Sequence, residues 1–277
     1  MKKIHIGIII GIVAVIIGII AAVLPKPVKD TAKAAALEVF SAQKAQEALE
    51  AGKLNQAKKL YKKVMETTEG AGELNKIQEK IEEINMKIIF SSVKDECSDI
   101  YTVQPKDVLM KIARKFNTTV GLIQRANNLK SDIIRLKQKL KVNICPFSIV
   151  VDKSQNKLFL KRKGEIIKTY NVSTGKDNTT PVGTFKISND KLRNPAWYRI
   201  GAVIPPDSPD NILGTRWMGL KGLDNNGIDV KGYGIHGTTK PQDLGKQITL
   251  GCVRMKNEDV EELFDIVPSG TEVTIVD

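Results

Sequence analysis

Two residues in the C-terminal part of the chain could together perform nucleophilic chemistry. Cys252 lies in the segment Thr249-Leu250-Gly251-Cys252-Val253-Arg254, 16 residues after His236, and the only other histidine is His5. A free thiol is only a few per cent thiolate at neutral pH, so a cysteine nucleophile needs a neighbouring imidazole that accepts its proton. Gly251 beside the sulfur would let backbone N–H groups approach a developing oxyanion.

Competing interpretations of these residues have different strengths. A lone cysteine is more often a small buried residue, and His236 could be a polar residue satisfied near a turn. Gly232 to Gly237 matches the Gly-x-Gly-x-x-Gly pattern of dinucleotide sites, but no amphipathic helix follows and Pro241 interrupts the stretch. Since no Cys-x-x-Cys pair occurs, a zinc site is not expected. We therefore expect neither a metal nor a cofactor.

An almost unbroken apolar run extends from Ile4 to Leu24, between two lysines and Pro25. A helix of that length spans about 30 Å, the thickness of a bilayer's hydrocarbon core. A cleaved signal peptide has a shorter apolar part of about 7 to 15 residues and an Ala-x-Ala-like site. We favour a retained single-pass membrane anchor in residues 1–27. Both interpretations place the other domains outside the cytoplasm.

The chain is basic and has three cysteines. Its net charge is +12, from 43 Lys and Arg against 31 Asp and Glu. Because the lysines are spread along an exported chain, we expect an anionic wall polymer or lipid as the partner rather than nucleic acid. Thiols outside the cytoplasm tend to pair. Cys97 and Cys145 bracket one candidate module and could form a disulfide that leaves Cys252 unpaired, or all three could be unrelated buried thiols.

Residues 28–96 predict a helical spacer. Apolar residues recur at helical spacing, and Ala51 to Leu54 interrupts them like a helix-helix turn, so we expect a helical hairpin followed by a helix over Leu74 to Ile89. The hairpin resembles a single tetratricopeptide-type repeat through Ala48, Gly52, Leu54, Ala57, Leu60 and Tyr61. One repeat rarely makes a stable solenoid, so a spacer is favoured over a partner-binding unit.

Residues 97–146 predict a strand, two helices and a closing strand. The words Tyr101-Thr102-Val103-Gln104, Asn127-Asn128-Leu129 and Leu140-Lys141-Val142 resemble a LysM domain. The resemblance implies a βααβ fold that binds N-acetylglucosamine-containing glycans, chiefly peptidoglycan, with Gln104, Asn127 and Asn128 as glycan-binding candidates. The chain departs from the family at Pro105 to Val108 and Lys137 to Lys139, where the family usually has glycine. Because the first and last strands pair in that fold, the resemblance favours a Cys97–Cys145 disulfide.

Residues 147–277 predict a mostly-β domain. Short apolar strands alternate with tight turns, beginning with Ile149 to Asp152 and ending with Glu272 to Val276. One helix is expected from Asn257, as its N-cap, to about Ile266. We expect Trp217 to be a core residue.

This domain resembles the catalytic domain of L,D-transpeptidases, the YkuD-like family of cell-wall cross-linking enzymes. Five segments carry the resemblance. They are Thr180-Pro181-Val182-Gly183-Thr184-Phe185, Asn194-Pro195 with Trp197, Leu213-Gly214-Thr215-Arg216-Trp217-Met218-Gly219-Leu220, Ile235-His236-Gly237-Thr238 and Thr249-Leu250-Gly251-Cys252-Val253-Arg254-Met255. Leu250 departs from the family, which more often has His there, and we expect altered loop packing or substrate preference rather than lost activity.

The resemblance implies a role for each residue. Cys252 attacks the carbonyl before the terminal D-alanine of a tetrapeptide stem and forms a thioester, while His236 accepts the thiol proton and the Gly237 carbonyl orients His236. An amine from a neighbouring stem then resolves the thioester into a cross-link. The remaining candidates are the Gly251 and Cys252 N–H groups with Tyr233 for the oxyanion, Arg254 for a substrate carboxylate, Thr249 as a pocket lining and Trp197 as a substrate contact.

The sequence thus predicts a multidomain protein with a transmembrane helix, a helical spacer, a small α+β LysM module and a mostly-β catalytic domain. Its expected function is that of a cell-membrane-anchored, extracytoplasmic L,D-transpeptidase whose partner is peptidoglycan. Two alternatives stay open. One is a non-catalytic wall-binding structural protein, and the other is a cysteine carboxypeptidase or peptidase.

Overall fold

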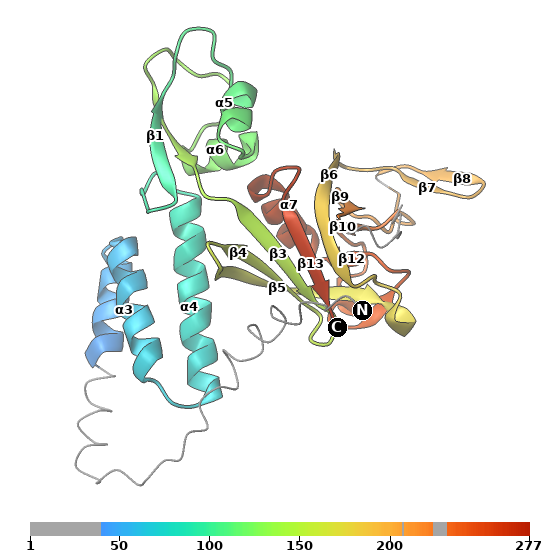
Figure 1. The fold of residues 1–277 in the computed structure, drawn as a ribbon, viewed down its shortest axis with the longest axis horizontal. Coiled ribbons are helices and arrows are strands. Elements are labelled where there is room, and N and C mark those ends of the chain that lie inside the picture. Colours follow the sequence, from blue (N-terminus) through green and yellow to red (C-terminus); the bar gives the residue numbers. More distant parts are fainter. Residues whose placement is uncertain (1–39, 207, 224–231) are drawn as a thin grey trace, which may run out of the picture.

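The computed structural model describes residues 40–206, 208–223 and 232–277. The anchor expected at Ile4 to Leu24 lies outside these residues. Within the described ranges, no helix combines the length and the apolar character that crossing a bilayer requires. The described chain forms a helical region, a small α+β module and a β-barrel, in that order (Figure 1).

The helical region contains three consecutive helices. A helix over residues 40–50 precedes α3 (Leu54–Thr67) and α4 (Ala71–Ile89). Gly52 allows the expected turn between the first two because its φ is +69°, a left-handed value that favours glycine. Small and aliphatic residues of all three helices pack together, including Ala48, Ala57 and Ile84. The helix expected from Leu74 is α4, which begins three residues earlier, at Ala71.

Helix α4 also packs against the barrel. Its Asn85 Nδ2 donates to the carbonyl of Ile167 at 3.3 Å, and its Glu82 carboxylate accepts from the backbone N–H and the hydroxyl of Thr169 at 2.9 and 2.8 Å. Ile167 and Thr169 belong to strand β5 (Glu165–Gly175). The helix therefore connects the two parts laterally as well as along the chain.

The small module has the βααβ order expected of a LysM domain. Strands β1 (Ser98–Thr102) and β2 (Lys139–Asn143) pair antiparallel, with Ser98 opposite Asn143 and Thr102 opposite Lys139. Helices α5 (Leu109–Lys115) and α6 (Val120–Ala126) lie between them in the chain. Thr119 caps α6, since its hydroxyl accepts from the N–H of Leu122. Because Ser98 and Asn143 pair, the chain enters and leaves the module at the same end, which we call the neck.

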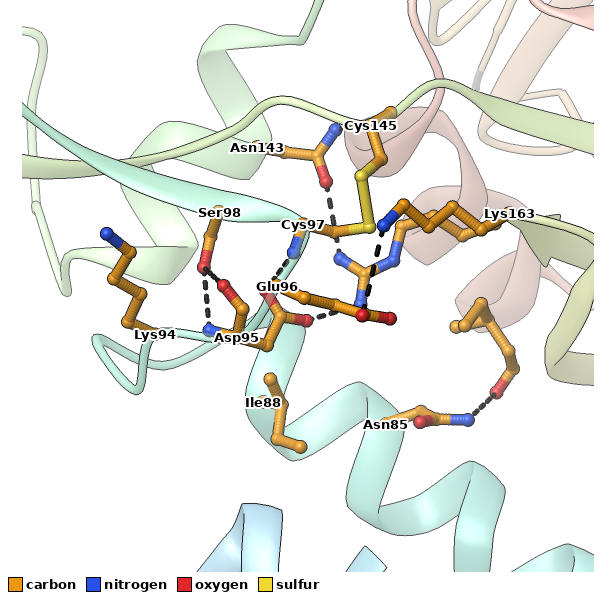
Figure 2. A network of polar contacts seen from close by, with 12 residues as sticks. Asn85, Ile88, Lys94, Asp95, Glu96, Cys97, Ser98, Asn143, Cys145 and Lys163 are labelled. Atoms are coloured by element: carbon orange, nitrogen blue, oxygen red, sulfur yellow. Dashed lines mark hydrogen bonds and ion pairs between the residues drawn. A yellow bond between two sulfur atoms is a disulfide. The ribbon is translucent and has the colours of Figure 1, made fainter.

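The neck is fixed by covalent and ionic contacts (Figure 2). Cys97 and Cys145 form a disulfide there. Beside it, Arg162 from the barrel donates to Asp95 at 2.5 Å and to Asn143 Oδ1 at 3.3 Å. Both members of the Arg162–Asp95 ion pair are largely buried. Because each polar group has a partner, the neck can be buried without an uncompensated charge.

A buried lysine joins the module to the end of α4. The Lys141 ammonium donates to the carbonyls of Ile88 and Ser91 at 2.5 and 2.9 Å. Burial lowers the pKa of Lys141 to about 8, and the negative charge of Asp95 opposes this shift. A cation at the last carbonyls of a helix is favoured by the helix dipole.

The barrel is one closed sheet. Within the described residues the strand order is β11-β5-β12-β10-β9-β6-β13-β3-β4, and pairing of β4 with β5 closes it. Helix α7 (Asn257–Ile266) contributes Val260, Leu263, Phe264 and Ile266 to the core. A separate hairpin of β7 (Trp197–Arg199) and β8 (Ala202–Ile204) extends from the barrel (Figure 1). The remaining strands are β3 (Phe147–Asp152), β4 (Lys157–Arg162), β6 (Gly183–Arg193), β9 (Arg216–Gly222), β10 (Gly234–His236), β11 (Gln247–Thr249), β12 (Val253–Met255) and β13 (Glu272–Val276).

Candidate active site

Two short parallel strands bring the candidate residues onto one face of the sheet. Strand β10 pairs with β12 so that Ile235 lies opposite Val253 and His236 opposite Arg254. Ile235 and Val253 are fully buried in the core. Because side chains alternate along a strand, His236 and Arg254 point to the other face. Cys252 immediately precedes β12, so the pairing brings the residue after the thiol opposite the residue before His236.

His236 is held in one tautomer by the backbone. Its side chain is buried, and Nδ1 lies 2.7 Å from the carbonyl oxygen of Gly237. A carbonyl only accepts, so Nδ1 carries the proton and Nε2 is the basic nitrogen. Burial lowers the pKa of His236 to about 4, although the Gly237 carbonyl opposes the shift. The imidazole is therefore neutral at physiological pH and able to accept a proton.

Trp217 from β9 covers this imidazole. It lies opposite His236 in the antiparallel β9–β10 pair, and the two rings stack with centroids 5.8 Å apart. The expectation that Trp217 is a core residue is wrong, because its side chain is only half-buried and contacts His236. Gly234 makes room for the indole, since a Cβ at Gly234 would lie 2.7 Å from Trp217 atoms.

Cys252 is half-buried and is the one free cysteine of the described chain. Its thiol donates to the carbonyl of Gly232 at 3.6 Å, and the structure has no hydrogen bond between the thiol and His236. Burial raises the pKa of Cys252, while the N–H of Gly234 and the charge of Arg254 oppose the shift. The resting site therefore holds a neutral thiol and a neutral imidazole.

The turn before Cys252 is held by Thr249. The Thr249 hydroxyl accepts from the N–H of Gly251 at 3.1 Å and donates to the carbonyl of Cys252 at 2.7 Å. The Gly251 N–H is thus bonded inside the turn, and Thr249 is buried. The oxyanion role of Gly251 and the pocket role of Thr249 stay predictions. The hydroxyl both accepts and donates because the turn leaves one donor and one acceptor without a strand partner.

Gly251 and Tyr233 are packed against each other. Gly251 has φ +129°, and a Cβ there would lie 2.5 Å from the Tyr233 ring. A larger residue would therefore clash with the ring and strain the backbone. Tyr233 is thereby placed beside the residue that precedes the thiol.

Asn257 holds the loop that orients His236. Its Oδ1 accepts from the N–H of Thr238 at 3.0 Å and from the N–H of Thr215 at 3.3 Å. The expectation that Asn257 is the N-cap is wrong, because Lys256 is the N-cap residue and makes no side-chain cap. Asn257 Oδ1 also lies 2.2 Å from where a Cβ on Gly237 would be, so Gly237 must be glycine. No pattern in the sequence predicts this contact.

Arg254 and Trp197 differ in their relation to the site. Arg254 is half-buried on the face of His236, its Nε is buried without a hydrogen-bond partner, and none of the described carboxylates forms an ion pair with it. Trp197 lies on the β7–β8 hairpin, where its ring faces the guanidinium of Arg199. The described contacts link Arg254, but not Trp197, to the pair of Cys252 and His236.

The LysM candidates have different environments. Asn127 is used within the module, since its Nδ2 donates to the carbonyls of Ile123 and Lys141 and its Oδ1 accepts from the N–H of Lys141. These contacts give Asn127 a structural role within the module, and its glycan contact stays a prediction. Gln104 and Asn128 are exposed, and Gln104 Nε2 donates to the carbonyl of Thr102.

Comparison with known proteins gives two family matches. The model of the L,D-transpeptidase catalytic domain matches residues 146–275, and that of the LysM domain matches residues 101–143. The chain is 42% identical over 130 residues to the putative L,D-transpeptidase YqjB of Bacillus subtilis (strain 168), covering 47% of this chain and 70% of that protein. It is 33% identical over 184 residues to the putative L,D-transpeptidase YkuD of Bacillus licheniformis, covering 64% of this chain and 98% of that protein.

Proposed function

The chain belongs to the L,D-transpeptidase family of cysteine enzymes, and from this premise we propose that it cross-links peptidoglycan through a thioester on Cys252. The observation that supports the proposal is the parallel pairing of β10 with β12, in which His236 lies opposite Arg254, two residues after Cys252. The contact of Nδ1 with the Gly237 carbonyl leaves Nε2 of His236 as the base for the proposed nucleophile.

Acylation begins when the thiol leaves the Gly232 carbonyl and gives its proton to Nε2 of His236. The sulfur then attacks the carbonyl that joins the third residue of a tetrapeptide stem to its terminal D-alanine. The tetrahedral intermediate collapses as the C–N bond breaks, and the imidazolium returns the proton to the departing amine. D-alanine leaves and the stem is held as a thioester.

Deacylation repeats these steps with a new nucleophile. The amine of a neighbouring stem attacks the thioester, His236 accepts the amine proton, and the thiol is regenerated as the new amide forms. The Gly237 carbonyl keeps Nε2 directed to the reacting atoms in both half-reactions by holding Nδ1–H. If water attacked instead, the product would be a shortened stem without a cross-link.

Oxyanion stabilisation falls to the N–H of Cys252 and to Tyr233. The Gly251 N–H is bonded to Thr249, so it does not supply a donor in the resting turn. Preorganised donors at this position are typically worth about 3 kcal/mol each. Arg254, which has no carboxylate partner among the described residues, holds a carboxylate of the stem.

The other parts of the chain bring this site to its substrate. We propose that the LysM module holds glycan strands, that the helical region acts as a spacer, and that residues 1–27 anchor the chain in the membrane. The helical region spans residues 28–96, the LysM module residues 97–146 and the catalytic domain residues 147–277. The enzyme is thus associated with the cell wall.

The proposal is tested by incubating the full chain in a non-ionic detergent with a disaccharide-tetrapeptide. Mass spectrometry would follow release of D-alanine and formation of the cross-linked dimer. We expect both products, and neither with Cys252→Ala. Shortened monomer without dimer would identify a carboxypeptidase, and no turnover by a folded chain would favour a wall-binding protein without catalysis.

A further inference from the structure

The net charge of the chain is concentrated in the LysM module. Residues 101–143 contain ten lysines and arginines and two aspartates, so eight of the twelve net positive charges of the chain lie in this segment. Nine of the ten basic side chains are exposed, and only Lys141 is buried. The charge is therefore a property of the module's surface.

Many of these cations lie at the end of the module opposite the neck, which we call the distal tip. The β1–β2 register places Thr102 opposite Lys139 at this end, and Val103 exchanges backbone hydrogen bonds with Lys137 and Gln138. The two loops that meet there are residues 103–108 and 128–138. The exposed basic residues of these loops are Lys106, Lys130, Arg135 and Lys137, and the exposed Lys139 follows at the start of β2.

The cations of the distal tip are not neutralised by the protein. None of them forms an ion pair with a described carboxylate. The two aspartates of the segment accept from neutral donors instead, Asp107 from the Tyr101 hydroxyl and Asp132 from Gln124 Nε2. In the helical region five lysines, Lys58, Lys62, Lys76, Lys80 and Lys87, do pair with glutamates. Five uncompensated cations on two adjoining loops and the start of β2 indicate an anionic ligand.

Two of these lysines occupy backbone positions that favour glycine. Lys106 has φ +70° and Lys137 has φ +64°, both in the left-handed region. A non-glycine residue there is less stable than glycine, because its Cβ approaches the backbone. The chain thus presents a charged side chain at two positions of these loops where glycine would be favoured.

Several features distinguish among anionic ligands. Four of the five cations are lysines, which act as point charges, whereas single carboxylates are held best by the planar fork of arginine. A chain of phosphodiesters offers many charges to such a surface. The distal tip also lies away from the end at which the described chain begins, at residue 40 (Figure 1). Helix α4, which lies between residue 40 and the module in the chain, has 19 residues and is about 28 Å long.

We propose that the distal tip of the LysM module binds a linear wall polymer whose charges are phosphodiesters. The uncharged N-acetylglucosamine strand does not require these cations, so the polymer is a second ligand of the module. Several lysines contact successive phosphates and release their counterions, which makes the affinity depend strongly on salt. The interaction concerns binding alone and is the same in a Cys252→Ala chain.

The test measures binding of labelled poly(glycerol phosphate) to the full chain in a non-ionic detergent. We expect the affinity to fall about tenfold or more between 50 and 200 mM salt. Lys106→Gly with Lys137→Gly should weaken binding about tenfold, since each removes one cation. Because both positions favour glycine, the thermal unfolding midpoint should not fall, which separates lost binding from lost folding.

A matched control and two other ligands complete the experiment. Lys59→Gln with Lys63→Gln removes two exposed charges from the helical region and should leave polymer binding unchanged. Binding of the uncharged N-acetylglucosamine hexamer should not change with salt. The proposal is overturned if the glycine variant binds the polymer like the unmodified chain, or if that variant loses affinity only for micelles containing phosphatidylglycerol.

Discussion

The carbonyl oxygen of Gly237 lies 2.7 Å from Nδ1 of His236, and Asn257 holds the same loop through the N–H of Thr238. A backbone carbonyl thus takes the part that a carboxylate plays in other cysteine and serine enzymes. It fixes the tautomer without adding a full negative charge. Burial of the ring lowers the pKa of His236 to about 4 in spite of this contact, so the imidazole is a weak base that is unprotonated above about pH 5.

The resting thiol should react slowly with alkylating agents at neutral pH. Burial raises the pKa of Cys252, so its thiolate fraction at pH 7 is smaller than that of a free cysteine. The rate with iodoacetamide should rise with pH through the alkaline range and show no plateau between pH 5 and 7. Such a plateau would reveal a preformed thiolate–imidazolium pair and contradict the neutral resting state. Free cysteine, measured under the same conditions, is the reference.

Replacing Asn257 should impair catalysis through His236. Asn257→Leu removes the acceptor for the Thr215 and Thr238 N–H groups, so the Gly237 loop can shift, and we expect kcat to fall about 10- to 100-fold with little change in KM. Asn257→Asp keeps an acceptor of the same shape and should retain more activity. Its added charge should raise the pKa of His236 and move the acidic limb of the pH profile upward. Equal losses in both variants, with no shift of that limb, would show that Asn257 is only structural.

The hydroxyl of Thr249 can be tested with a pair of substitutions. Thr249→Val leaves the Gly251 N–H and the Cys252 carbonyl without their partner, and each unsatisfied buried group costs about 1 to 3 kcal/mol. We expect a clear fall in kcat/KM and in the thermal unfolding midpoint. Thr249→Ser keeps the hydroxyl and should stay near the unmodified enzyme in both measurements. A fully active Val variant would mean that the turn does not position Cys252.

The disulfide at the neck should contribute to stability but not to the chemistry. Cys97 and Cys145 are 48 residues apart, and a closed loop of that length corresponds to about 4 kcal/mol in the chain-entropy account. Cys97→Ser with Cys145→Ser should lower the free energy of unfolding by about that amount in urea titrations. A reducing agent should destabilise the unmodified chain equally and leave the double variant unaffected. Equal stability with and without the bond would contradict this role.

Patterns local in the sequence predicted the parts of the chain. The strand-helix-helix-strand order and the words around Tyr101 and Asn127 predicted a LysM module, and the family match over residues 101–143 confirms it. The L,D-transpeptidase resemblance is likewise confirmed by the match over residues 146–275. Alternating apolar residues and turn residues are local signals, so both modules could be recognised without the structure.

Contacts between distant segments could not be predicted in the same way. The three-residue strands β10 and β12 are too short to show a period, so their parallel pairing had no signal. The position of Asn257 before an acidic first turn predicted a helix cap, but its side chain bonds residues 19 and 42 positions away. The role of Thr249 inside its turn could not be predicted for another reason. A threonine hydroxyl can either line a pocket or bond the backbone of a turn, and the sequence looks the same in both cases.

Acyl-enzyme formation in a single turnover tests directly whether Cys252 is the nucleophile. The full chain in non-ionic detergent is mixed with excess disaccharide-tetrapeptide, quenched in acid and analysed by intact mass and peptide mapping. We expect an adduct on Cys252 that lacks D-alanine, forms much more slowly in His236→Gln, and is absent in Cys252→Ala. An adduct at another residue, or D-alanine release that persists in Cys252→Ala, would contradict this expectation.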